Sequence, residues 1–157
     1  MKATSTIAGA EGVVVRLQAA SPALRGRLEK AVERVTITLS GYVKAEKLTG
    51  QVLKNRTGRL RRSINHSVTS SGQAIVGTVG TNVSYARVHE FGFTGAQSVR
   101  AHVRTIKQAW GKPIAATQIN VKTHARTVKI PARSFLRSAL NDQRTSIKAA
   151  LAAAVKG

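Results

Sequence analysis

The sequence predicts an α+β fold: a long N-terminal amphipathic helix and a C-terminal helix packed on an antiparallel sheet, with a protruding basic β-hairpin arm. Apolar residues recur at helical spacing near both ends of the chain, and strand-like alternation occupies residues 57–81. A segment at residues 98–106 also recurs at residues 120–128. Helices that share one face of an antiparallel sheet are a common way to bury such stripes.

The composition limits the function. A chain of 157 residues is expected to form a single domain, 1–157, with its core in 22–92 and 131–155 and an inserted hairpin arm at 98–128. Lys and Arg number 26 against 6 Asp and Glu, a net charge of +20, which predicts a polyanionic neighbour such as nucleic acid or an acidic protein. Cysteine is absent, so disulfide and thiol chemistry are excluded. No membrane span or secretory signal is expected.

The first helix has a clear start signal. In residues 1–20, Val13–Val15 favours a strand and Arg16–Ala20 a helix, and a short helix is the expectation. Ser21–Pro22 then provides an N-cap and a first-turn proline. The following stripe predicts an amphipathic helix over 22–47, ended by Thr49–Gly50, with the apolar positions Leu24, Leu28, Ala31, Val35, Leu39 and Tyr42.

The middle and the end of the chain complete the domain. Residues 57–81 are expected to be β, with a hairpin turn at Ser70–Gly72, and their glycines indicate a bulge or a close backbone approach. Ser84 is expected to cap a helical turn at residues 85–90. Pro131 is expected to open the last helix, residues 132–155, whose stripe is Leu136, Leu140, Gln143, Ile147, Leu151 and Ala154.

The repeated segments predict a long antiparallel hairpin with a turn at 111–113. Alternation gives it one Val/Ala/Thr face and one basic face, formed by Arg100, His102 and Arg104 together with Lys122, His124 and Arg126. These side chains are candidates for contact with DNA phosphates or an acidic protein surface, and a merely solvated face is the alternative. A second basic patch, with the same alternatives, consists of Lys54, Arg56, Arg59, Arg61 and Arg62.

The sequence gives little support for catalysis or for metal binding. The acids are scattered, and neither a phosphate-binding G-x-x-x-x-G-K-[ST] loop nor a G-x-S-x-G nucleophile motif occurs, so no enzyme and no cofactor are expected. His102 and His124 could face each other across the hairpin as zinc ligands. A stable zinc site needs three or four ligands, and no Cys or acid is nearby, so two polar hairpin residues are the favoured interpretation. Glu90 is a lone acid that could pair with Arg87 or Arg133, or cap a helix.

Three ordered motifs carry a family resemblance. They are Thr57–Ile64, then Tyr85–Ala86 with Glu90–Gly92, then Pro131–Leu136 with Ala139–Leu140. In this order and spacing they resemble the tail-completion (minor tail, neck) proteins of long-tailed bacteriophages, over roughly residues 5–155. The basic hairpin between the second and third motifs resembles the form found in lambda-like phages and prophages. Ser134 departs from the proline that the family commonly has there.

The resemblance implies a structural virion protein of the neck or tail, assembled in the host cytoplasm, and not an enzyme. Such proteins form rings, usually homo-hexameric, at the head-proximal end of the tail, which they complete and join to the capsid connector. The implied partners are the tail terminator or tail tube, the head–tail connector proteins and genomic DNA in the channel, with no membrane. The motif residues then have structural roles: Gly58 in the turn from helix to strand, Tyr85, Phe91 and Phe135 as anchors of the helices on the sheet, and Glu90 with Arg133 as a polar tie.

Two other functions remain open. One is a nucleic-acid-binding protein of the host or phage that uses the 98–128 ribbon. The other is a sister neck component, a tail terminator or a head-closure protein. In each case the ribbon is expected to lie outside the folded core, as an arm that reaches a neighbouring subunit, a partner ring or DNA.

Overall fold

The computed structural model describes residues 10–16, 21–71 and 74–156. Its contacts divide the chain into two compact units. The first, here called the core unit, comprises residues 1–92 and 131–157, and the second, here called the arm, comprises residues 93–130. The predicted α+β class is confirmed, and each unit is described by itself below.

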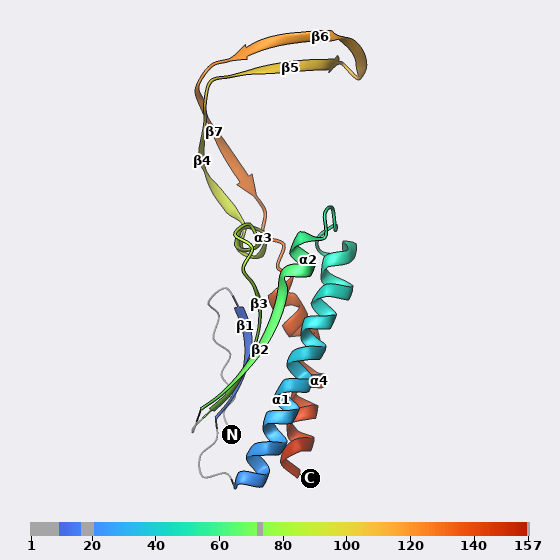
Figure 1. The fold of residues 1–157 in the computed structure, drawn as a ribbon, viewed down its shortest axis with the longest axis vertical. Helices are drawn as coiled ribbons and strands as arrows, with labels where there is room; N and C mark the ends of the chain where they lie inside the picture. Colours follow the sequence, from blue (N-terminus) through green and yellow to red (C-terminus); the bar gives the residue numbers. More distant parts are fainter. Residues whose placement is uncertain (1–9, 17–20, 72–73, 157) are drawn as a thin grey trace. The chain divides into compact units, whose positions relative to one another are not determined.

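A three-stranded antiparallel sheet lies in the core unit, in the order β1-β3-β2 (Figure 1). The strands are β1 (Ala10–Arg16), β2 (Ile64–Ser71) and β3 (Ala74–Thr81). The predicted β2–β3 hairpin is confirmed. The short helix expected near the N-terminus is wrong for residues 10–16, because this β-branched run pairs with β3 throughout. Residues 1–9 and 17–20, on which the rest of that prediction falls, lie outside the described residues.

The first helix begins where the sequence predicts and ends differently. Helix α1 (Pro22–Tyr42) is capped by Ser21, whose Oγ accepts from the Leu24 amide at 3.3 Å. Beyond it, η1 (Val43–Gln51) continues as a π-helix, and helical geometry breaks at Gly50, where φ is 134°. The expected α-helix to residue 47 is therefore too long by one turn, while the predicted Thr49–Gly50 stop coincides with the break.

Two shorter helices and the last helix complete the core unit. Helix α2 (Arg59–Ser63) replaces the β structure expected at residues 59–63, and α3 (Ala86–Phe91) follows the sheet. Tyr85 takes the cap position of α3 without a side-chain bond, so the predicted Ser84 cap is wrong. Helix α4 (Leu136–Lys156) starts later than the expected residue 132, because residues 131–134 form a connection that binds α3.

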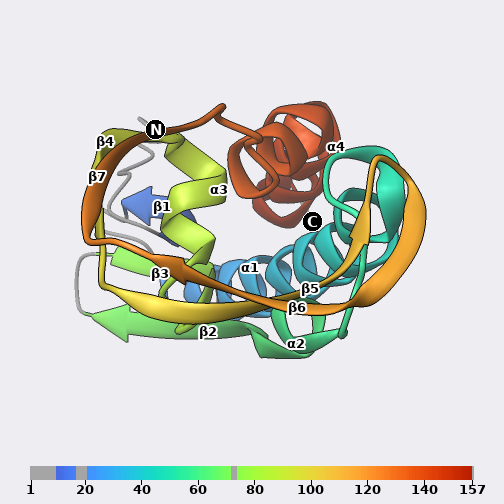
Figure 2. The same ribbon diagram turned by 90° about the horizontal axis from the view of Figure 1, so that it is seen from above.

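Helices α1 and α4 lie side by side against the sheet (Figure 1; Figure 2). Their apolar stripes bury Leu28, Val32 and Ile147 with Ile75 of the sheet, and Leu39 and Val43 with Phe135 and Val79. At Gly77 in β3 a Cβ atom would overlap Thr36 Oγ1 and lie 3.0 Å from Val32 Cγ1. The close backbone approach predicted from the strand glycines is confirmed here, because α1 crosses β3 where only glycine fits.

The arm is a two-stranded antiparallel ribbon with one interruption and one register shift, which lies between Ile106 and Gln108. Strand β4 (Phe93–Val99) pairs with β7 (His124–Ile130), and β5 (His102–Ala109) pairs with β6 (Lys112–Val121). The turn lies at Trp110 and Gly111, with φ of 53° and 76°, one residue earlier than expected. Positive φ at both central residues is typical of the type I′ turns that close two-residue hairpins.

The sequence repeat coincides with a local two-fold relation in the arm. Val99 pairs with His124, and the equivalent residue of the other copy, Val121, pairs with His102. At each copy the ring Nδ1 of the histidine lies 2.9 Å from the carbonyl oxygen two residues earlier, that of Arg100 before β5 and that of Lys122 before β7. Because a carbonyl only accepts, each ring nitrogen donates. The repeat thus specifies the same interruption twice, once in each strand of the ribbon.

Candidate functional site

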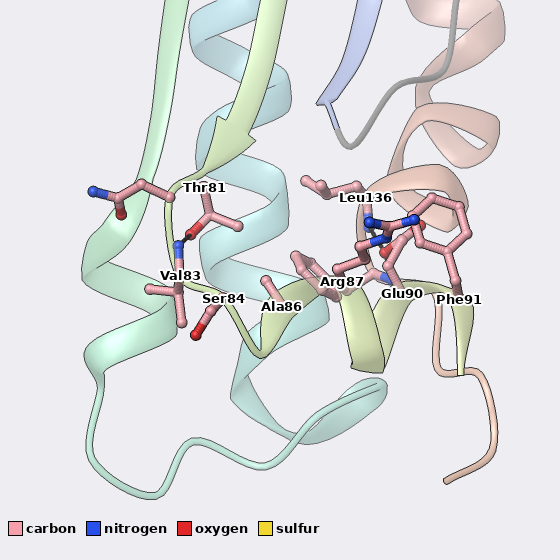
Figure 3. A pocket seen from close by; sticks show the side chains of 10 residues that line it. Thr81, Val83, Ser84, Ala86, Arg87, Glu90, Phe91 and Leu136 are labelled. Carbon is pink, nitrogen blue, oxygen red and sulfur yellow. Dashed lines mark hydrogen bonds between the residues drawn. The ribbon is translucent and has the colours of Figure 1, made fainter. Parts of the chain in front are cut away.

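Glu90 organises the junction between α3 and α4 (Figure 3). Its side chain comes from α3 and is buried, with the residue only 5% exposed. One carboxylate oxygen accepts from Ser134 Oγ at 2.5 Å and from the Arg137 amide at 3.0 Å. The other accepts from the amides of Phe135 at 2.8 Å and Leu136 at 3.0 Å. A carboxylate at a helix N-terminus satisfies amides that have no partner within the helix and complements its dipole.

This bonding defines what Glu90 can do. Four donors occupy its two oxygens, so the carboxylate is a structural cap and is not placed to act as a general base. The expected tie to the Arg133 side chain is corrected, because the partners of Glu90 are Ser134 and backbone amides. Arg133 contributes its own amide, which donates to the carbonyl of His89 at 2.7 Å. The cap role that the sequence left open is the one that the structure shows.

The aromatic motif residues divide into two kinds. Phe135 is fully buried in the core, whereas Tyr85 and Phe91 stay exposed. Tyr85 contacts the His89 ring edge-on at 5.9 Å, and the guanidinium of Arg137 lies 5.3 Å from the Phe91 ring centre. The expectation that all three anchor helices in the core is therefore corrected for Tyr85 and Phe91.

A cavity of about 280 Å³ beside Glu90 is lined by Thr81, Asn82, Val83, Ser84, Ala86, Arg87, Phe91, Phe135 and Leu136 (Figure 3).

The basic patch of the core unit surrounds α2. Gly58 precedes this helix with φ of 71°, a left-handed conformation that favours glycine, so it opens α2 rather than a strand. Arg61 Nε donates to the Lys44 carbonyl at 3.1 Å, and an Arg62 guanidinium nitrogen donates to the Thr57 carbonyl at 3.1 Å. These two arginine side chains therefore bind nearby backbone carbonyls, whereas the backbone amide of Arg59 donates to Thr57 Oγ1. All three side chains lie on exposed residues.

The pairing register places the basic residues of each copy opposite uncharged residues of the partner strand. Every pair joins an even-numbered residue to an odd-numbered one, as in Arg104 with Ile119 and Arg126 with Gln97. Paired residues share a face, so His102 and Arg104 share theirs with Val121 and Ile119, and His124 shares its face with Val99. The predicted single basic face opposite a Val/Ala/Thr face is therefore wrong. Arg100 and Lys122 lie in the interruption between the strand pairs.

The two arm histidines are not opposite each other. His102 pairs with Val121 and His124 with Val99, and each ring nitrogen already donates to a carbonyl of its own strand. Among the residues that the structure describes, no group of three or more His, Cys, Asp or Glu side chains is placed to hold a metal ion. The geometry thus gives the histidines a local role at the interruption.

A polar cluster that the sequence did not predict joins α1, η1 and α4. The buried Lys47 ammonium lies 2.6 Å from an Asp142 oxygen, which also accepts from the Tyr42 hydroxyl at 3.0 Å. The hydrogen bond from Lys47, followed by that from Tyr42, holds the pKa of Asp142 below its ordinary value. The same bond to Asp142 raises the pKa of Tyr42. The only sequence signal was Lys47 itself, four residues after the apolar Val43 of the helical stripe.

The site geometry defines a class of protein before any comparison does. It is an α+β protein whose polar centres hold helices together, and its two-stranded ribbon forms a separate unit. In the described part of the chain no helix is long and apolar enough to cross a membrane. A model of the phage virion morphogenesis family matches residues 38–156. The chain therefore belongs to this family of phage virion proteins, with a tail-associated role that is structural rather than catalytic. No curated protein and no solved structure matches it.

Proposed function

We propose that this protein forms a ring at the head-proximal end of the phage tail, completes the tail and joins it to the capsid connector. Family membership supports a tail-associated virion protein, and the three motifs described above support this position within the tail. The ring is homo-hexameric, it contacts the tail terminator or tail tube on one side and the connector on the other, and it assembles in the host cytoplasm.

The observation that carries the proposal is the arm. Its two strand pairs form sheets of only two strands, so each of its four strands has an open edge. An isolated two-stranded ribbon is marginally stable in water, and this one has none of the buried hydrophobic residues of the described chain. A ribbon with open strand edges and no core of its own is suited to binding a partner, and this supports an assembly role.

Complementation of a phage that lacks the gene tests the proposal. Cells infected with such a phage are expected to accumulate filled heads and tails of normal length that stay apart under the electron microscope. The purified protein added to the lysate should restore joined, infectious particles. Tails of uncontrolled length would instead indicate the sister role of tail terminator, and normal joining without the protein would reject a neck role.

In the alternative function, the protein binds nucleic acid on its own. Its oligomeric state and the salt dependence of its DNA binding distinguish this alternative from the neck role. Light scattering of the purified protein at several salt concentrations, with and without connector or tail, follows the assembly. A ring that forms on its own or on a phage partner and survives high salt supports the neck role. A monomer that binds duplex DNA with a steep salt dependence, and never joins heads to tails, supports the alternative.

A further inference from the structure

We propose that the arm is a duplex-DNA-binding ribbon that enters a groove of the double helix, with Trp110 at its turn as the contact to the bases. The arm carries cations and no acid between residues 93 and 130: Arg100, Arg104, Lys107, Lys112, Lys122, Arg126 and Lys129. In the proposed ring the neighbouring copies also carry a net charge of +20, so they do not neutralise these cations. The charge calls for a polyanion.

The distribution of these cations favours a groove over a flat surface. The sequence repeat extends to Arg104-Thr-Ile-Lys107 in β5 and Arg126-Thr-Val-Lys129 in β7. Side chains three residues apart on a regularly paired strand point to opposite faces, so Arg126 and Lys129 place a cation on either face of the β4–β7 pair. A partner surface would neutralise one face and leave the other exposed. The walls of a DNA groove carry phosphates on both sides, and the major groove admits a two-stranded β-ribbon.

Trp110 supplies the second observation. It is the only tryptophan of the chain, it is 99% exposed, and it has a positive φ of 53°. A bulky residue with positive φ is strained, and Asn-Gly is the favoured pair for a type I′ turn. A strained, exposed indole beside Gly111 indicates a contact that offsets the strain, because strained residues cluster where they bind. Stacking on bases or wedging into a base step is the contact that a lone indole on a basic ribbon can make with DNA.

A chain of this charge binds DNA non-specifically in any case, so the experiment must show that the arm itself contacts the DNA. The single tryptophan gives an intrinsic probe at the turn itself. Titration of the full-length protein with a short blunt-ended DNA duplex at low salt is expected to quench the emission of Trp110. The logarithm of the affinity should fall linearly with the logarithm of the salt concentration.

Two variants and one matched control separate the arm from the basic patch of the core unit. Arg104→Gln with Lys107→Gln removes two exposed arm cations, and Arg56→Gln with Lys54→Gln removes two exposed cations of the core unit. The arm pair is expected to lower the salt slope by about 2, with weaker quenching at a given duplex concentration. The control pair should leave the quenching of Trp110 in place.

Trp110→Asn separates binding from folding, because it creates the favoured Asn-Gly turn and relieves the strain. The affinity for a labelled duplex, measured by fluorescence anisotropy, is expected to fall about tenfold or more while the thermal midpoint stays the same or rises. Unchanged emission on adding duplex, or equal losses for the arm and control pairs, overturns the proposal. Emission that shifts only with heads or tails made without this protein also overturns it, in favour of a protein partner. None of these outcomes alters the complementation test of the neck role.

Discussion

Among the described residues, every buried hydrophobic side chain belongs to the core unit, from Leu28 in α1 to Ile147 in α4. Most of the large exposed apolar side chains belong to the arm, namely Phe93, Val103, Trp110, Ile114 and Ile119. Both regions are rich in apolar and basic residues, so composition does not distinguish them. The difference lies in burial, because the core unit buries many of its apolar side chains and the arm buries none of its own.

The polar groups follow the same division. Glu90 and Asp142 are tied within the core unit, each by more than one donor. The arm contains cations without a single acid in its sequence. Both of these acids are held by donors of the core unit itself, whereas the arm has no acid to neutralise its cations. We therefore propose that the core unit determines folding and that the arm serves assembly, and each prediction below tests one side of this proposal.

The largest effect is expected from removing the arm, within the segment 99–128. Val99 and His124 are paired, so replacing residues 100–123 by Asn-Gly closes the remaining β4–β7 stub with a two-residue turn. Thermal unfolding followed by circular dichroism should stay within a few degrees of the wild type. Infectious particles in the complementation assay should be lost. A variant that fails to fold would place the arm in the folding of the core instead.

Glu90→Ala is expected to lower the free energy of unfolding by about 3–5 kcal/mol, because it leaves two buried and two part-buried donors without their acceptor. Urea unfolding measures the change, and Glu33→Ala on the exposed face of α1 serves as control, with an effect within about 0.5 kcal/mol. Glu90→Gln should also destabilise, since its amide hydrogens face other donors. Equal midpoints for Glu90→Ala and the wild type would contradict the cap.

These cases show which features could be predicted from the sequence. The long helices, the β2–β3 hairpin and the arm follow from periodicity, which is a local property. The start of α4 does not, because Pro131 favours a helix locally while Glu90, distant in the sequence, binds the amides at residues 135–137 and fixes the actual start. The faces of the arm depend on pairing register, and a shift of one residue exchanges them. Neither the bonds of Glu90 to α4 nor the pairing register of the arm leaves a local signal in the sequence.

Gly77→Ala tests the packing of the core unit at its tightest point. The added methyl group overlaps Thr36 Oγ1, and the expected loss is about 1–3 kcal/mol in urea unfolding. Thr36→Ala in the same chain should recover part of this loss, since it removes the overlapping atom. Gly41→Ala is the matched control, because nothing lies within 4 Å of its added methyl group and alanine favours the helix, so stability should rise by about 0.5–1 kcal/mol. A loss at both sites would point to backbone strain rather than to packing.

The smallest effect is a pH dependence confined to the core unit. Lys47, and then Tyr42, lower the pKa of Asp142. The contribution of Asp142 to stability is therefore fully present above the pKa of the unfolded state, near 3.8, and is lost as pH falls through the pKa of the folded state. The bond to Asp142 raises the pKa of Tyr42 above 10.0, so that contribution is present below this value and is lost as pH rises through the folded pKa. Urea midpoints should therefore separate wild type from Asp142→Asn near neutral pH and converge in acid. The urea midpoints of Tyr42→Phe and of the wild type should converge at alkaline pH. Because both groups belong to the core unit, the arm-deleted chain should show the same two convergences, and their loss on deletion would mean that the arm contributes to the core.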